Sequence, residues 1–257
     1  MGRGVGLACK QFRKAMIAAS GAVARPRYCF QAIRLGAREL YRRYQEDRAR
    51  VSEEDFSRLV PEAVEVKLAD FECCDGNVAP YELLVIAGLV QYMAPRVLLE
   101  IGTFDGNTTL QMALNAPTDA LVFTLDLPLG SSETALPRDR DDLTYVSDTR
   151  RVRPRFMRHP GVGNVIRLFG DSAAFDFRGA LDGRSVDLAF IDGSHSYSYV
   201  KNDTERVLEL LSPRGVILWH DYTPAWPGVW HYLNELRKDY PIVRIKGTTL
   251  GYFRHQL

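Results

Sequence analysis

The sequence has few cysteines and no long apolar run. Its 257 residues include four cysteines, Cys9, Cys29, Cys73 and Cys74, and none has the CxxC spacing of a zinc or redox motif. A disulfide between the adjacent Cys73 and Cys74 would be strained. No stretch of about 18 apolar residues occurs, so no transmembrane helix is expected. These absences favour a cytoplasmic protein with free thiols, although residues 15–26 weakly resemble a signal peptide with an Ala-x-Ala cleavage site.

The sequence also has little net charge, but the charge is uneven. The formal net charge is +1, whereas residues 1–50 carry 12 Lys and Arg against 3 Asp and Glu. Within this segment, apolar residues recur at helical spacing opposite a row of arginines, which predicts an amphipathic basic helix over residues 30–48. Its cationic face could simply be solvated, or it could make a weak contact with a membrane surface or a partner protein. No nucleic-acid partner is expected, and a homo-oligomer stays open.

Short β-rich runs alternate with helical patterns in the rest of the chain. The predicted strands are residues 97–101, 120–126, 165–169, 186–192 and 215–219, and the predicted helices are residues 80–93, 108–115 and 199–211. This alternation is typical of a doubly wound, Rossmann-like α/β sheet. Residues 52–55 are interpreted as the start of a helix, and residues 242–254 as a closing hairpin.

The predicted domain organisation has two parts. Residues 1–75 form a basic helical extension, and residues 76–257 form the α/β domain, for which 46% hydrophobic content suffices for one core. Within the domain, residues 128–164 are long, polar and rich in Arg, Asp and Pro. Loops of this length are usually functional or disordered. Because this loop follows a strand that ends in an acid, we interpret it as a substrate lid.

The most informative turn is EIGTFDGNT at residues 100–108, directly after a predicted strand. Its glycines permit a tight turn and a close approach of the backbone to a ligand. The G-x-x-x-G spacing differs from the G-x-G-x-x-G of dinucleotide-binding turns. Glu100 and Asp105 would repel a diphosphate, but they suit a ligand with an ammonium and a sulfonium group. A dinucleotide site and a purely structural strand-to-helix turn remain alternatives.

Acids also follow the next two strands. Asp126 lies 24 residues after Gly102, where a carboxylate can accept hydrogen bonds from both ribose hydroxyls of a nucleoside. Asp171 and Ser172 could contact the adenine ring, or could instead cap a helix.

A second group of polar residues follows the last two predicted parallel strands. Asp192 and His195 come after one strand, and His220 and Asp221 after the other. Converging carboxylates favour a bound divalent cation, and His220 would shift the preference from magnesium toward a transition metal. His195 is the natural general base because its ordinary pKa is near neutral. Capping of the following helix by His195 and a structural role for His220 are the alternatives.

Two motifs, IDGSHSY at residues 191–197 and GVILWHDY at residues 215–222, resemble those of class I S-adenosylmethionine-dependent methyltransferases. Within that class the resemblance is to a bacterial group related to macrolide-sugar O-methyltransferases and, more distantly, to catechol O-methyltransferase. It covers roughly residues 80–253. The resemblance implies a seven-stranded sheet with an antiparallel last strand.

The resemblance also implies roles for individual residues. The implied cofactor contacts are Glu100, Gly102, Gly106, Asp126 and Asp171, and we expect the cofactor also to be contacted by Phe104, Thr108, Ser172 and Asp192. The acid and the basic residue of the metal-dependent relatives correspond to Asp192 and His195. Their second metal pair is replaced here by His220 and Asp221, or by Asp221 and Tyr222 in another alignment, so one oxygen ligand is missing and magnesium dependence is in doubt.

We therefore expect S-adenosylmethionine-dependent O-methylation of a small molecule such as a sugar or a natural-product hydroxyl. His195 would take the proton, while Asp192 and Asp221, with or without a metal, would position the acceptor. An NAD-dependent oxidoreductase and a non-catalytic scaffold that docks through its basic N-terminal helix are the alternatives.

Overall fold

The computed structural model describes residues 36, 51–74, 76–131, 133–138 and 142–255. The chain divides into two units after Ala49, and the fold below is that of the unit beginning at Arg50. Apart from residue 36, the basic helix predicted over residues 30–48, and with it the membrane or partner contact, lies outside the described residues. Within the described ranges, no helix is long and apolar enough to span a membrane.

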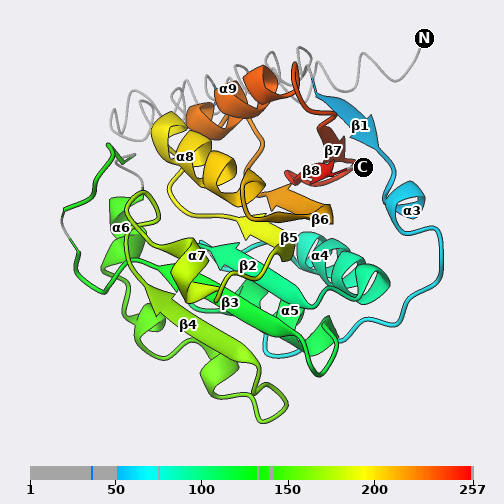
Figure 1. The fold of residues 1–257 in the computed structure, drawn as a ribbon, viewed down its shortest axis with the longest axis horizontal. Helices are drawn as coiled ribbons and strands as arrows, with labels where there is room; N and C mark the ends of the chain where they lie inside the picture. The colour runs from blue at the N-terminus through cyan, green and yellow to red at the C-terminus, as the bar shows by residue number, and fades with distance from the viewer. Residues whose placement is uncertain (1–35, 37–50, 75, 132, 139–141, 256–257) are drawn as a thin grey trace, which may run out of the picture. The chain divides into compact units, whose positions relative to one another are not determined.

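One mixed sheet, with eight strands among the described residues, organises this unit. The strands are β1 (Ser52–Glu54), β2 (Val97–Ile101), β3 (Leu121–Asp126), β4 (Val165–Phe169), β5 (Val186–Ile191), β6 (Leu211–Trp219), β7 (Val243–Ile245) and β8 (Gly251–Arg254). Their order is β1-β7-β8-β6-β5-β2-β3-β4, which runs across Figure 1 from the upper right to the lower left. The last strand, β8, is antiparallel to both β6 and β7, and the remaining neighbours are parallel. The predicted doubly wound sheet with an antiparallel last strand is thus confirmed.

Helices cover both faces of the sheet because successive residues of a strand point to opposite sides. The longer helices are α4 (Pro80–Met93), α5 (Asn107–Asn115), α8 (Tyr197–Leu208) and α9 (Pro227–Leu236), and helices of four residues include α3 (Phe56–Leu59) and α7 (Phe177–Ala180). Leu98 of β2 packs in the cluster that contains α4 and α5. Its neighbour Leu99 packs in the cluster that contains α7, α8 and α9.

Residues 52–54 differ from their predicted structure. They form β1, which pairs in parallel with β7 and adds an eighth strand to the sheet, and a helix begins only at Phe56. The pairing also includes a hydrogen bond from the Lys246 N–H to the Glu54 carbonyl oxygen. A strand of three residues that is stabilised by a partner almost 200 positions away (Ser52 pairs with Val243) leaves no local pattern to detect.

The predicted lid, residues 128–164, is more structured than its composition suggests. It contains α6 (Leu143–Val146) and two 3₁₀ turns, η1 (Thr149–Val152) and η2 (Arg155–Met157). Two of its arginines are buried: Arg151 is 4% exposed and Arg155 is 7% exposed. The Arg155 guanidinium donates two hydrogen bonds to Asp105, of 2.9 and 3.0 Å, so part of this segment is fixed against the turn that follows β2.

Candidate active site

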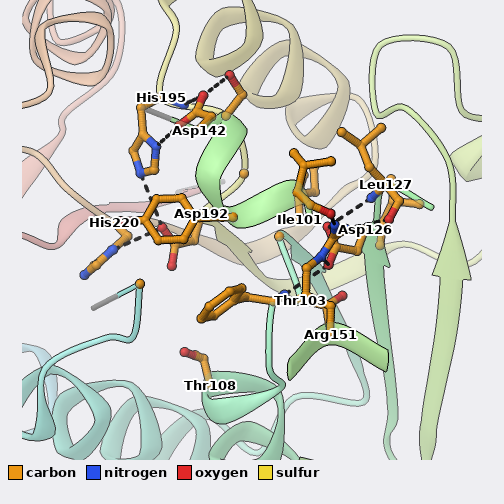
Figure 2. A pocket seen from close by; sticks show the side chains of 18 of the residues that line it. Ile101, Thr103, Thr108, Asp126, Leu127, Asp142, Arg151, Asp192, His195 and His220 are labelled. Carbon is orange, nitrogen blue, oxygen red and sulfur yellow. Dashed lines mark hydrogen bonds and ion pairs between the residues drawn. The ribbon is translucent and has the colours of Figure 1, made fainter. Parts of the chain in front are cut away.

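A cavity of about 350 Å³ lies at the carboxyl ends of β2, β3, β5 and β6. Parallel strands of such a sheet end at one edge, which is where α/β proteins bind their ligands. Residues at or just after the ends of these four strands line the cavity, among them Gly102, Asp126, Asp192 and Asp221, and residues 170–172 after β4 line it as well. The lid contributes Asp142, Tyr145, Val146 and Arg151 to the lining. Figure 2 shows His195 and Asp142 on one side of the cavity and Asp126 and Arg151 on the other.

The turn after β2 touches the loop after β5. Gly102 has φ = +102°, and a Cβ atom at this position would lie 2.0 Å from the carbonyl oxygen of Asp192. Only glycine therefore fits. The next segment places the N–H of Phe104 3.1 Å from Asp126 Oδ2. The predicted cofactor turn and the predicted catalytic loop are thus walls of one cavity.

Most of the residues predicted to contact the cofactor line this cavity, but two do not. Those that do are Gly102, Phe104, Thr108, Asp126, Asp171, Ser172 and Asp192. Gly106 instead lies against Phe156 and Pro154. Glu100 is fully buried and accepts hydrogen bonds from the hydroxyls of Thr109 and Thr124. Burial raises the pKa of Glu100 to about 8, despite these two bonds.

Asp126 is held by a partner that the sequence did not indicate. Its Oδ1 lies 2.9 Å from the Leu127 N–H and 2.8 Å from Arg151 Nη2, and its Oδ2 lies 3.1 Å from both the Phe104 N–H and Arg151 Nε. Burial raises the pKa of Asp126, and the Arg151 guanidinium offsets part of that rise. A carboxylate has about four lone-pair positions, so these four nitrogens leave no position open for a ribose hydroxyl.

The side chain of Asn107 fits a polar ligand such as the amino-acid end of S-adenosylmethionine. Asn107 is the first residue of α5, is 2% exposed and lines the cavity. Neither its amide nitrogen nor its oxygen has a hydrogen-bond partner among the described residues. Buried amides without partners are costly, and here a ligand with a carboxylate and an ammonium group would supply partners for both atoms.

His195 lies between carboxylates. Its Nδ1 is 2.7 Å from Asp142 Oδ1, and its Nε2 is 3.1 Å from Asp221 Oδ2 and 3.9 Å from Asp192 Oδ1. Because an ionised carboxylate only accepts hydrogen bonds, Nδ1 carries the proton of the contact with Asp142. Burial alone would lower the pKa of His195, but the contacts with Asp142 and Asp221 outweigh burial and raise it to about 10. The imidazole also stacks on Trp226, with ring centroids 3.9 Å apart.

His220 contacts Asp192 and a buried acid on α4. Its Nδ1 is 3.0 Å from Asp192 Oδ1, and its Nε2 is 3.2 Å from Oε2 of Glu82 on α4. The pKa of His220 is well above its usual range: burial opposes this rise, and the charges of Asp192 and Asp221 outweigh burial. Both ring nitrogens therefore face carboxylates.

Three of the candidate residues are placed to hold a cation. Ligand atoms of Asp192, His195 and Asp221 all lie within 4.8 Å of one another. Asp221 has a left-handed backbone, with φ = +57°, which is uncommon for a residue other than glycine and recurs at functional sites. The structure therefore places Asp192 and Asp221, the two acids of the predicted metal site, next to each other. The third member of the group is His195. The two nitrogens of His220, the predicted ligand, face Asp192 at 3.0 Å and Glu82 at 3.2 Å.

A family comparison decides which class of domain this is. Residues 99–222 match a family model described as a methyltransferase domain. The matched segment contains the turn after β2, Asp126, and both motifs around His195 and His220. Residues 99–222 form an S-adenosylmethionine-dependent methyltransferase domain. The NAD-dependent oxidoreductase is therefore not supported as an alternative for this domain.

A curated relative matches only a short part of the chain. It is an uncharacterized protein of Sinorhizobium fredii, 45% identical over 58 residues. These residues are 22% of this chain and only 6% of that protein. The relative therefore says nothing about the activity of the whole chain.

Solved structures show the same fold at low sequence identity. The O-methyltransferase TomG from Streptomyces achromogenes, solved with S-adenosylmethionine, is 16% identical with a TM-score of 0.51, covering 79% of this chain and 94% of that one. The O-methyltransferase NovP is 17% identical with a TM-score of 0.51, covering 68% and 80%. The Podospora anserina methyltransferase PaMTH1, solved with S-adenosylhomocysteine, is 15% identical with a TM-score of 0.50, covering 71% and 81%. These likenesses extend the methyltransferase fold beyond residues 99–222.

Proposed function

We propose that the methyltransferase domain transfers the methyl group of S-adenosylmethionine to a hydroxyl of a small molecule such as a sugar or a natural product. The observation that carries the proposal is the contact between Gly102 and Asp192. It joins the cofactor turn to the loop that bears Asp192 and His195, so a methyl donor and an acceptor oxygen can meet in one cavity. TomG and NovP, which share the fold, are described as O-methyltransferases.

In the proposed reaction the acceptor oxygen attacks the methyl carbon while the carbon–sulfur bond breaks. The bonding electrons go to sulfur and leave S-adenosylhomocysteine, and the hydroxyl proton goes to Nε2 of His195. Asp142 accepts from Nδ1–H at 2.7 Å and so fixes the tautomer and the direction of the ring. Alignment of the two reactants supplies most of the acceleration, and proton transfer adds about 10² to 10⁴-fold.

The electrostatics impose a condition on His195. With its pKa at about 10, it carries a proton at neutral pH, so it can serve as a base only when its contact with Asp221 is replaced. Asp192 and Asp221 offer oxygen ligands for a hard divalent cation, which would lower the pKa of an acceptor hydroxyl and compete with His195 for Asp221. In this arrangement the oxygens of Asp192 and Asp221 alone would hold the cation, and Nε2 of His195, the third member of that group, would stay unligated and available to the acceptor proton.

Methyl transfer from ¹³C-methyl-labelled S-adenosylmethionine tests the proposal. Sugars, phenols and catechols are incubated with the protein, and NMR identifies the atom that receives the label. We expect label on oxygen, with His195→Ala slower by about 10² to 10⁴-fold and His159→Ala, which changes a histidine outside the cavity lining, unaffected. Label on nitrogen or carbon, or His195→Ala with an unchanged rate and pH profile, would contradict it. S-adenosylhomocysteine binding without transfer to any acceptor would favour the scaffold.

A further inference from the structure

Glu82 is a buried acid outside the matched domain, and it does not line the cavity. It lies on α4, is 6% exposed, and is 138 residues from His220 in sequence. Its Oε1 accepts from both the backbone N–H and the hydroxyl of Thr249, at 2.6 and 2.9 Å. Its Oε2 faces Nε2 of His220 at 3.2 Å. One carboxylate therefore connects α4, the turn between β7 and β8, and the end of β6.

The connection continues to the catalytic loop. His220 Nδ1 lies 3.0 Å from Asp192 Oδ1, and the His220 N–H donates to the carbonyl oxygen of Ile191 at 3.1 Å. Since carboxylates only accept, an imidazole between Glu82 and Asp192 donates from both of its nitrogens. This contact engages one oxygen of Asp192, Oδ1, and restrains the orientation of its carboxylate. The other oxygen, Oδ2, takes no part in the bond with His220.

We propose that Glu82 is a positioning residue for methyl transfer: through His220 it holds the Asp192 carboxylate in the orientation that receives the acceptor. This inference rests on the function proposed above. Glu82 is not among the residues that line the cavity, and although its Oε2 also accepts from the Ala79 N–H at 3.3 Å, its hydrogen-bonded route to Asp192 runs through His220. Groups that orient a catalytic or ligating residue in this way typically matter 10- to 100-fold.

The substitution Glu82→Gln separates positioning from packing. The amide oxygen can still accept from Thr249, while the NH₂ group takes the place of Oε2, presents a donor to His220 Nε2 and gives up the capping bond from the Ala79 N–H. Two donors cannot share a hydrogen bond, so His220 has to lose its Nε2 proton or turn away. Thr249→Val is the matched control, because it removes a bond to Glu82 and leaves the contact between Glu82 and His220 in place.

The kinetic test is a double-mutant cycle in the full chain. We expect Glu82→Gln to lower kcat 10- to 100-fold and to leave the KM for S-adenosylmethionine unchanged. In a protein that already carries Asp192→Asn, the same substitution should lower kcat less than about threefold. Thr249→Val should stay within about threefold of wild type. A merely structural Glu82 would give the same loss in both backgrounds. That result, or wild-type activity in Glu82→Gln, would overturn the proposal.

An NMR measurement that needs no methyl acceptor tests this inference separately from the proposed function. In ¹⁵N-edited NMR of the histidine side chains, wild-type His220 should show N–H signals at both nitrogens, and Glu82→Gln should lose the Nε2–H signal while still binding S-adenosylhomocysteine. An unchanged His220 spectrum would overturn the positioning role. If the spectrum changes as expected but wild type methylates no oxygen, the positioning contact stands and the proposed function fails.

Discussion

Asp142 Oδ1 lies 2.7 Å from His195 Nδ1, although the two residues are 53 positions apart. Asp142 also accepts hydrogen bonds from the Ser194 hydroxyl at 2.7 Å and from the His195 N–H at 3.1 Å. It belongs to the segment predicted as a lid. That segment therefore does more than line the cavity, because it supplies the acid that orients the candidate base.

Asp142→Asn is expected to shift the pH dependence of kcat toward lower pH. The amide oxygen can still accept from Nδ1–H, but the negative charge that raises the pKa of His195 is gone. The pKa of His195 then falls below about 10, and the unprotonated form required of a base appears at lower pH. The rising limb of the profile should move down by about one pH unit or more. Asp148→Asn changes an acid of the same segment that pairs with Arg150 and serves as the control. An unmoved limb, or one that moves upward, would show that Asp142 does not act on the base.

Glu100→Gln is expected to leave cofactor affinity unchanged and to stabilise the fold at high pH. A buried acid with a raised pKa favours the folded state while it is protonated, and it costs stability as the pH rises above the pKa of the unfolded chain. For Glu100 this cost develops between about 4.5 and 8, and Gln removes it. The free energy of unfolding should therefore exceed that of wild type at pH 8 to 9. Calorimetry with S-adenosylhomocysteine should give a Kd within about twofold of wild type. A loss of tenfold or more would restore Glu100 as a direct cofactor contact.

Arg151→Met is expected to tighten cofactor binding. Arg151 takes up two of the four contacts to the Asp126 oxygens, and a ribose hydroxyl would have to displace it. Without the guanidinium, Asp126 stays buried and unpaired until a ligand binds, which destabilises the free protein by about 3 kcal/mol and lowers the Kd several-fold. Arg155→Met breaks the comparable pair with Asp105 and should destabilise the protein without tightening binding. Weaker binding by Arg151→Met would instead make Arg151 a cofactor contact.

Removal of divalent cations is expected to slow methyl transfer about 10- to 100-fold, an effect that added Mg²⁺ or Mn²⁺ reverses. The reason is the convergence of Asp192 and Asp221, whose ligand atoms lie within 4.8 Å of each other and of His195. Asp221→Asn should reduce both the activity and its response to added cation, whereas Asp176→Asn, which changes a helix cap on α7, should affect neither. Full activity after chelation would exclude a required cation.

The sequence was sufficient to predict the site residues at the strand ends. It was not sufficient to predict the side chains that contact them. Asp126, Asp192 and Asp221 each follow a buried apolar run, and parallel strands place such residues at a common edge. Glu82 lies in the first turn of an apolar helix, where it accepts from the Ala79 N–H in a capping box, and this local role gives no indication of its contact with His220, 138 residues away. Asp142 lies in a loop where acids and arginines alternate, and only the folded chain singles it out. The three residues of β1 were missed for the same reason, since long-range pairing alone holds them.

Calorimetric titration with S-adenosylhomocysteine, with NAD titrated in parallel, is the most direct test of the central claim that this cavity binds the methyl donor. Wild type should bind S-adenosylhomocysteine and not NAD. Gly102→Ala should weaken binding at least tenfold, because its Cβ would meet the Asp192 carbonyl at 2.0 Å. Gly183→Ala, which has a similar backbone with φ = +69° but open space around it, should bind as wild type does. Binding of NAD without S-adenosylhomocysteine, or equal affinity in Gly102→Ala, would contradict the account.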